Sequence, residues 1–167
     1  MPIWKTLDIA APALILAQGI SRIGCDVFGD PISSILPWGM EINGEYLHPS
    51  QAYEFLLDYL LFGYLCLRLK KPSYSGQVFI HYLIGFMLIR GIVEFTRINP
   101  MFFGPFSVSH IMSLIGIIIG FTLIKYQRQK GKMEKGMVIK KSDYIKTALL
   151  VFGLMVVSLI LYYLVQG

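Results

Sequence analysis

Five long apolar stretches, joined by short polar segments, constrain the fold of this chain more than any other feature. They cover approximately residues 7–24, 51–69, 76–98, 106–124 and 145–165. Each has about the 20 residues that an α-helix needs to cross the hydrocarbon core of a bilayer. The chain is 55% hydrophobic and 15% charged, whereas soluble domains are about 25% charged. The sequence therefore predicts an all-α, polytopic integral membrane bundle of about five transmembrane helices, and it excludes a soluble globule.

The first stretch is the least regular, because Pro12 and Gly19 interrupt it. A proline removes one backbone hydrogen bond of a helix, so we expect a bent or a re-entrant helix. A secretory signal peptide is the other interpretation of an apolar N-terminal stretch. Asp8 lies where such a peptide carries basic residues, and Gln18 and Arg22 interrupt its apolar region. We therefore interpret the first stretch as part of the membrane domain.

The loops between the stretches alternate in charge. The loop 25–50 has acidic side chains but no lysine or arginine, and the turn 99–105 has no charged side chain. Basic side chains occupy the turn at 68–71, and the segment 125–146 has eight basic and two acidic residues. Because basic loops stay in the cytoplasm, we expect a cytoplasmic N-terminus and an external C-terminus. The net charge of +5 therefore indicates topology and contact with anionic lipid, and no nucleic-acid partner.

The charged side chains within or at the ends of the predicted helices include Arg22, Glu54, Asp58, Arg90, Glu94 and Arg97. A charge at membrane depth is costly, so each is a candidate for function. Arg90, Glu94 and Arg97 follow the i, i+4, i+7 spacing of one helical face. With the predicted topology, all six lie in the outer half of the bilayer. They predict a site for an anionic headgroup, since arginine suits phosphate binding. An Arg90–Glu94 ion pair that only holds the bundle together is the alternative.

The loop 25–50 adds further candidates. Its glycines and prolines predict turns that fold back over the site. His48 and Ser50 lie directly before the second apolar stretch. His48 is a candidate contact for a thiol or a phosphate, whereas Pro49 with Ser50 is also a common start of a helix.

Five motifs in a fixed order give the chain a family resemblance. They are Ser21-Arg22-Ile23-Gly24-Cys25 with the following Gly29-Asp30, Leu36-Pro37-Trp38-Gly39, His48-Pro49-Ser50-Gln51-Ala52-Tyr53-Glu54, Arg90-Gly91-Ile92-Val93-Glu94-Phe95-Thr96-Arg97, and Ser107-Val108-Ser109-His110. The sequence resembles bacterial prolipoprotein diacylglyceryl transferase over about residues 8–125. This region corresponds to the C-terminal part of that enzyme. The family's N-terminal spans, with their His-Gly-Gly segment, have no counterpart here, so a partner chain that supplies them is one expectation.

The resemblance implies a specific reaction in the bacterial cytoplasmic membrane. The family transfers a diacylglyceryl group from phosphatidylglycerol to the cysteine thiol of a prolipoprotein signal peptide, and glycerol phosphate leaves. Both substrates are therefore implied partners, together with membrane lipid, and no cofactor or metal is implied. Arg22, Arg90 and Glu94 match the family's catalytic positions. The expected substrate-binding residues are Gly24, Gly29, Asp30, His48, Ser50, Tyr53, Glu54, Arg97 and His110.

Three positions depart from the family pattern. Ser21 replaces a glycine, Cys25 stands where asparagine is common, and His110 lies where relatives often carry glutamine. Near neutral pH, an imidazole can serve as a general base. A packed, hydrogen-bonded histidine is the other interpretation of His110.

We expect three parts: a transferase-like membrane core at 1–126, a basic cytoplasmic loop at 127–144 and an extra C-terminal transmembrane helix at 145–167. The last is typical of an ordinary anchor or packing helix, because it has no ionisable residue other than tyrosine after Lys146. A non-catalytic relative that binds phospholipid or prolipoprotein is the alternative to an enzyme. A small transporter or channel subunit ranks last, since the fourth and fifth stretches offer almost no polar path to the cytoplasmic side.

Overall fold

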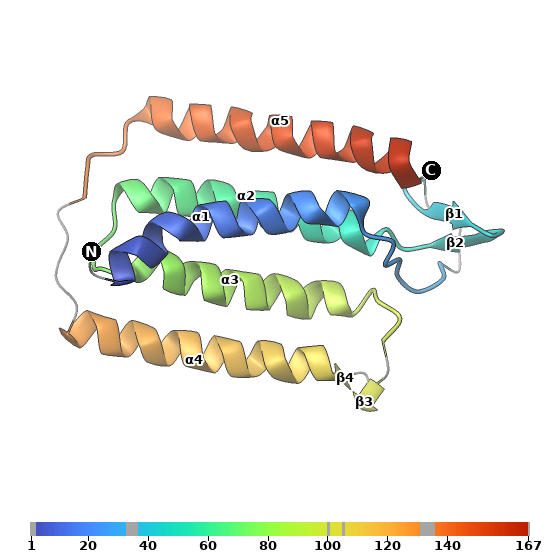
Figure 1. Cartoon of the computed structure of the whole chain (residues 1–167), viewed down its shortest axis with the longest axis horizontal. Helices are drawn as coiled ribbons and strands as arrows, with labels where there is room; N and C mark the ends of the chain where they lie inside the picture. The colour runs from blue at the N-terminus through green and yellow to red at the C-terminus, as the bar shows by residue number, and fades with distance from the viewer. Residues whose placement is uncertain (1–2, 33–36, 100, 105, 131–135, 167) are drawn as a thin grey trace.

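The computed structural model describes residues 3–32, 37–99, 101–104, 106–130 and 136–166. Its helices are α1 (Ile3–Ser21), α2 (Ser50–Lys70), α3 (Gln77–Glu94), α4 (Val108–Lys130) and α5 (Lys141–Gln166) (Figure 1). The predicted all-α class is confirmed, and each helix overlaps one apolar stretch of the sequence. Leu36 of the second motif, and parts of the predicted loops 99–105 and 125–146, lie outside the described residues.

Two short hairpins and one 3-10 turn gather at the same end of the bundle, which we call the hairpin end. Their elements are η1 (Arg22–Gly24), β1 (Met40–Ile42), β2 (Glu45–Leu47), β3 (Met101–Phe103) and β4 (Phe106–Ser107). β1 pairs with β2, and β3 pairs with β4, both antiparallel. Asn43 and Gly44 join β1 to β2 with φ values of 54° and 84°, as a two-residue type I′ turn requires.

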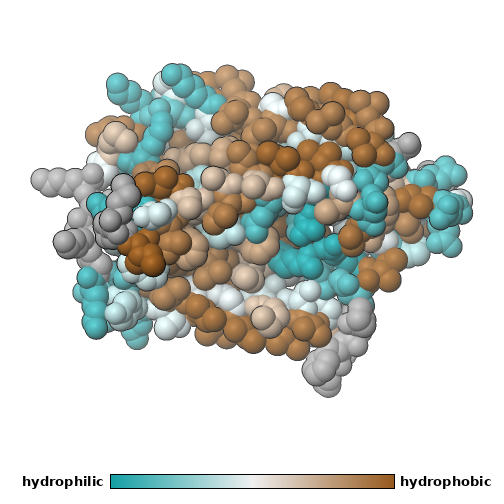
Figure 2. Space-filling view, in the orientation of Figure 1, coloured by the Kyte–Doolittle hydropathy of each residue, from teal (hydrophilic) through white to brown (hydrophobic). Residues whose placement is uncertain are grey.

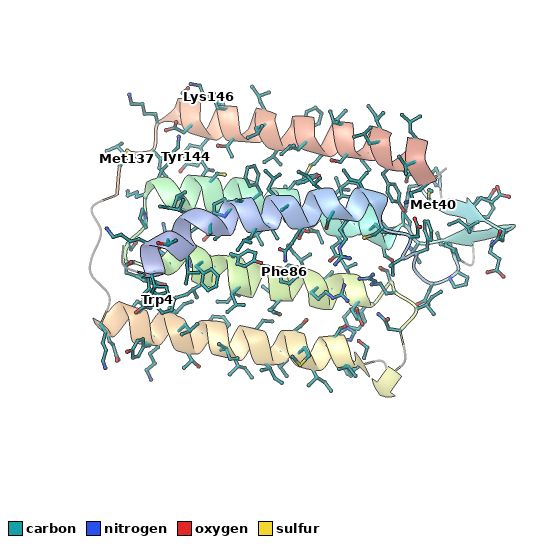
Figure 3. All side chains as sticks on the ribbon, in the orientation of Figure 1. Trp4, Met40, Phe86, Met137, Tyr144 and Lys146 are labelled. Atoms are coloured by element: carbon teal, nitrogen blue, oxygen red, sulfur yellow. The ribbon has the colours of Figure 1, made fainter. Side chains whose placement is uncertain are left out.

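The helices alternate in direction, so that α1, α3 and α5 run towards the hairpin end while α2 and α4 run away from it (Figure 1). The opposite end carries Lys70, Lys71, Arg128, Lys130 and Lys141, and we call it the basic end. In Figure 3, Trp4, Met137, Tyr144 and Lys146 lie at the basic end, and Met40 lies at the hairpin end. This arrangement agrees with the alternation of loop charge. Which end faces the cytoplasm stays a prediction.

α2 is the central helix, because it packs against α1, α3 and α5, whereas α4 packs mainly against α3. Among the described residues, four helices are long and apolar enough to cross a membrane: α1 with η1, α3, α4 and α5. α2 is long enough, but Glu54, Asp58, Arg68 and Lys70 make it more polar. Figure 2 shows hydrophobic side chains over much of the visible surface. The two acidic side chains of α2, Glu54 and Asp58, are buried within the bundle.

α1 is continuous through Pro12 and does not turn back, so the re-entrant alternative is wrong. Asp8, which argued against a signal peptide, is buried in the bundle. Its Oδ2 accepts a hydrogen bond from the Gly76 backbone amide at 2.6 Å, and its Oδ1 accepts one from the Phe79 amide at 2.9 Å. A carboxylate of one helix thus caps the N-terminus of another, where the helix dipole favours negative charge.

Candidate functional site

The centre of the site is the carboxylate of Glu54, on the first turns of α2. Its side chain is 2% exposed, and three guanidinium groups surround it. Arg22 approaches Oε1 at 2.9 Å, Arg97 approaches Oε2 at 3.5 Å, and Arg90 approaches Oε1 at 3.8 Å. The three arginines come from η1, α3 and the turn after α3. We call Glu54 and these three arginines, together with Glu94, the arginine cluster.

Glu94 completes the arginine cluster from the last residue of α3. Arg90 lies one helical turn away, with a nitrogen 3.6 Å from Oε2. Oε1 accepts hydrogen bonds from the Ser107 hydroxyl at 2.6 Å and from the Asn99 side-chain amide at 2.8 Å. Glu94 is therefore held on both sides, by α3 and by the segment that begins α4.

Arg97 reaches the cluster differently from the prediction. The third apolar stretch was expected to stay helical to about residue 98, but α3 ends at Glu94. The next backbone amides bond three residues back, and the last of them joins Arg97 N to the Glu94 carbonyl at 3.2 Å. These tight turns keep Arg97 on the same side as Arg90 although the α-helix has ended.

Several polar atoms of the cluster keep unused hydrogen-bonding capacity. Within the described residues, Glu54 Oε1, Arg90 Nη1, Arg97 Nε and Arg97 Nη1 are buried and form no hydrogen bond. Asp58, one turn further along α2, is also buried, and neither of its carboxylate oxygens accepts a hydrogen bond. Unsatisfied buried polar groups are costly, so their concentration at one place is typical of a site that binds a polar ligand.

Arg22 and Arg90 are the accessible members of the cluster. Their side chains are 25% and 26% exposed, whereas that of Arg97 is 7% exposed. Figure 2 shows a hydrophilic patch between α1 and α3, in the half of the bundle nearer the hairpin end. A ligand that comes from the membrane side therefore meets Arg22 and Arg90 first.

Four predicted substrate-binding residues, Gly29, Asp30, His48 and Ser50, form a junction beside the cluster. The Gly29 amide donates to the His48 carbonyl at 2.8 Å, and the Asp30 amide donates to the Thr96 carbonyl at 2.9 Å. The Ser50 hydroxyl donates to the same Thr96 carbonyl at 3.0 Å. A Cβ at position 29 would overlap the Thr96 carbonyl and the Ser50 hydroxyl. Gly29 and Ser50 thus hold the long loop against the end of α3.

His48 and Tyr53 lie together on the hairpin side of this junction. The Tyr53 hydroxyl is 3.3 Å from His48 Nδ1, and it accepts a hydrogen bond from the Trp38 indole at 3.0 Å. Gly24 is open to the surroundings, with no atom within 4 Å of where its Cβ would stand. The structure therefore brings Arg22, Arg90, Glu94, Glu54 and Arg97 together in one cluster. His48, Tyr53 and Gly24 lie around that cluster.

His110 lies in an apolar groove between α3 and α4, with a volume of about 580 Å³ and walls that include Gly91, Phe95 and Phe106. The Ser107 backbone amide donates to His110 Nδ1 at 3.1 Å. Because Nδ1 is an acceptor here, a neutral imidazole carries its proton on Nε2. Nε2 is buried and has no hydrogen-bond partner in the described part of the chain. This geometry favours the packed, hydrogen-bonded histidine over the general base.

α5 does more than anchor the chain, because it forms buried polar contacts with α2. The Tyr162 hydroxyl donates to Gln51 Oε1 at 3.2 Å, and Gln51 Nε2 donates to the Cys25 carbonyl at 2.9 Å. The Tyr59 hydroxyl lies 2.8 Å from the Ser158 hydroxyl. Tyr162, Gln51 and Cys25 thus connect α5 to the turn that carries Arg22.

The candidate residues from the sequence did not include Ser107, Asn99 and Gln51. Ser107 directly precedes α4 and is a typical helix-capping residue, yet its hydroxyl binds Glu94. Asn99 lies in a short polar turn, where asparagine is common for conformational reasons. Gln51 was visible as a polar residue at the start of an apolar stretch. In the described ranges, no group of three histidine, cysteine or acidic side chains is placed to hold a metal ion.

Comparison with known proteins identifies similar sequences but no similar solved structure. The family model for prolipoprotein diacylglyceryl transferase matches residues 1–126. A phosphatidylglycerol–prolipoprotein diacylglyceryl transferase of Finegoldia magna is 37% identical over 137 residues, which cover 78% of this chain and 54% of the relative. The proteins of that name from Clostridioides difficile and Clostridium tetani are 32% and 36% identical, and they are covered to 52% and 55%. The chain thus spans about half the length of these curated relatives. No solved structure matches it.

Proposed function

Since this chain belongs to the prolipoprotein diacylglyceryl transferase family, we propose that it transfers a diacylglyceryl group from phosphatidylglycerol to the lipobox cysteine of a prolipoprotein. The observation that carries the proposal is the convergence of Arg22, Arg90 and Arg97 on Glu54. The arginine cluster lies within the residues that match the family model. The reaction takes place in the outer half of the bacterial cytoplasmic membrane, with the hairpin end outward.

Arg22 and Arg90 bind the phosphate of the lipid in this mechanism. They are the accessible arginines, and guanidinium groups bind phosphate oxygens through paired, charge-assisted hydrogen bonds. Glu54 holds both groups in place when no lipid is bound. As the phosphate approaches, it takes over the ion pairs that Glu54 forms with Arg22 and Arg90, while Arg97 stays on Glu54.

The chemical step is a displacement at carbon. The lipobox thiol gives its proton to the aqueous phase, and the resulting thiolate attacks the diacylglyceryl carbon that bears the phosphate. A carbon–sulfur bond forms, the carbon–oxygen bond to phosphate breaks, and glycerol phosphate leaves with the electron pair. Negative charge grows on the departing phosphate, so Arg22 and Arg90 stabilise the transition state more than the ground state. Glu94 orients Arg90 across one helical turn.

Transfer is tested with the purified chain in phosphatidylglycerol proteoliposomes and a synthetic lipobox peptide, with the lipidated peptide measured by mass spectrometry. We expect product with the wild type and none with Arg90→Ala. Glu94→Gln is expected to reduce the rate less than Arg90→Ala, because it leaves the phosphate-binding guanidinium in place. Lys146→Ala is the matched control, since Lys146 is an exposed cation on α5 outside the cluster. The reverse order of Glu94→Gln and Arg90→Ala counts against phosphate stabilisation as the main role.

The same experiment separates the enzyme from a non-catalytic relative. If the chain binds phosphatidylglycerol in an Arg90-dependent way but yields no lipidated peptide, the binding protein is supported and the transferase is rejected. Expression in cells depleted of their own transferase gives a second measurement, with and without a co-expressed N-terminal fragment of a relative. Rescue by the wild-type chain but not by the Arg90→Ala variant supports the enzyme.

A further inference from the structure

A second group of arginines occupies the basic end, far from the arginine cluster. A pocket of about 370 Å³ is lined there by Arg68, Ser73, Tyr74, Gln77 and Arg128, and we call it the turn pocket. Arg68 comes from the last turn of α2, and Arg128 comes from the last turn of α4. Arg68 is fourteen residues beyond Glu54 on the same helix, which is about 21 Å along its axis. The two arginine groups thus lie at opposite ends of one bundle.

The turn pocket carries more positive than negative charge in the described part of the chain, where the charges of Arg68, Arg128 and Asp8 all act on Tyr74. No carboxylate in the described residues forms an ion pair with Arg68 or Arg128. Asp143 pairs with Lys70 at 2.6 Å, and the carboxylate of Asp8 accepts hydrogen bonds from two backbone amides of the α3 N-terminus. Two guanidinium groups around one pocket repel each other, so an anion between them would be stabilised.

Hydrogen-bond donors of the pocket also lack partners. The Arg68 Nε is buried and forms no hydrogen bond within the described part of the chain, and the buried Tyr74 hydroxyl finds no acceptor for its proton there. Tyr74 as a whole is 3% exposed. Burial raises the pKa of the Tyr74 hydroxyl, and the charge of Asp8 adds to that rise, while the charge of Arg128, a hydrogen bond from its side chain and the charge of Arg68 oppose it, which places both cations near the hydroxyl. A buried donor without a partner is costly unless a ligand satisfies it.

The turn itself is held in a fixed shape. Arg68 donates to the Ser73 hydroxyl at 3.2 Å, and the Ser73 amide donates to the Gln77 side-chain oxygen at 2.7 Å. Gln127, beside Arg128 on α4, donates to the Ser75 carbonyl at 3.1 Å. Arg68 is therefore held by a contact that does not use up its charge, and Arg128 follows a residue that is bonded to the turn. This arrangement is a built site, unlike the scattered lysines of a solvated loop.

We infer that the turn pocket binds a phosphate group, supplied either by the headgroup of an anionic phospholipid or by free phosphate. Arg68, Arg128 and the Tyr74 hydroxyl provide donors for its oxygens, and the position at the end of α2 and α4 is where the headgroups of the facing leaflet lie. The inference does not rest on the proposed reaction, because the pocket lies at the other end of the bundle and the test measures binding.

The test uses the purified full chain with Arg90→Ala, which removes one phosphate ligand from the arginine cluster. Phosphatidylglycerol, phosphatidylcholine or inorganic phosphate is added in detergent micelles, and bound molecules are counted by native mass spectrometry. We expect Arg128→Gln to weaken the binding of phosphatidylglycerol by about tenfold or more. Lys125→Gln is the matched control, because Lys125 is an exposed cation on the same helix that does not line the pocket. The inference is overturned if the Arg128→Gln and Lys125→Gln proteins bind phosphatidylglycerol with equal affinity and also bind phosphate with equal affinity.

A second variant, Tyr74→Phe, distinguishes a loss of binding from a loss of folding. It removes only a buried hydroxyl whose proton has no acceptor, so the thermal midpoint should change little, while the affinity should drop about threefold or more. Displacement of the lipid by inorganic phosphate identifies the phosphate group alone as the ligand. Retention of phosphatidylglycerol against excess phosphate identifies the lipid headgroup. Unchanged affinity in both Tyr74→Phe and Arg128→Gln rejects the site.

Discussion

Glu54 and Asp58 offer a direct test of what a carboxylate does inside this bundle, because they lie one turn apart on α2 and are both buried. Glu54→Gln removes the charge that holds Arg22 at 2.9 Å, Arg97 at 3.5 Å and Arg90 at 3.8 Å. Losing one partner of a buried pair costs about 3–5 kcal/mol, because the other charge is left uncompensated. Two of the three arginines are partly exposed, so we expect the lower end, about 3 kcal/mol.

A loss of this size lowers the thermal midpoint of a chain this long by roughly 6–12 °C. The assay is thermal unfolding of the purified protein in micelles. Asp58→Asn is the matched control: its carboxylate accepts no hydrogen bond in the described ranges, so the neutral amide should leave stability within about 1 kcal/mol. Phosphatidylglycerol should restore part of the midpoint of Glu54→Gln, since its phosphate replaces the missing charge. A larger loss for Asp58→Asn than for Glu54→Gln refutes this account of the cluster.

Two further substitutions test the surroundings of the cluster. Gly29→Ala should prevent stable folding, because its Cβ would overlap backbone and side-chain atoms of the junction, whereas Gly24→Ala should stay within about 0.5 kcal/mol of the wild type. Equal thermal midpoints for these two variants would contradict the packing at position 29. Tyr162→Phe removes the hydroxyl that holds Gln51 and, through it, the Cys25 carbonyl, so the Cys25 thiol should react with maleimide up to about fivefold faster. Cys66, at the other end of α2, is the internal control, and an equal acceleration of both thiols would indicate general loosening instead.

The sequence was sufficient to predict the helices and the grouping of charges, for a clear physical reason. Hydropathy reports whether a segment can lie in lipid, and the 3.6-residue period reports which side chains share a face. Arg90 and Glu94 were therefore placed together correctly. The period could not place Arg97, because the helix ends before it and tight turns take over.

Contacts between segments that lie far apart in the chain could not be predicted from the sequence. The junction of Gly29, Ser50 and Thr96 depends on how a long loop meets the end of α3, and no local pattern encodes that meeting. The role of Glu54 as the common partner of three arginines depends in the same way on the packing of α2 against α1 and α3. The polar contacts of α5 could not be predicted, because tyrosine and serine are common in apolar helices whether or not they form such contacts.

The capping of α3 by Asp8 has a consequence for the way this protein enters the membrane. The first amides of a helix have no acceptor within the helix itself, and lipid offers none. Asp8 precedes Gly76 by 68 residues, so it is synthesised before α3 begins. Asp8 of the first helix thus supplies acceptors for two amides at the start of the third helix. Replacing Asp8 by asparagine should slow the acquisition of protease resistance during synthesis into membranes.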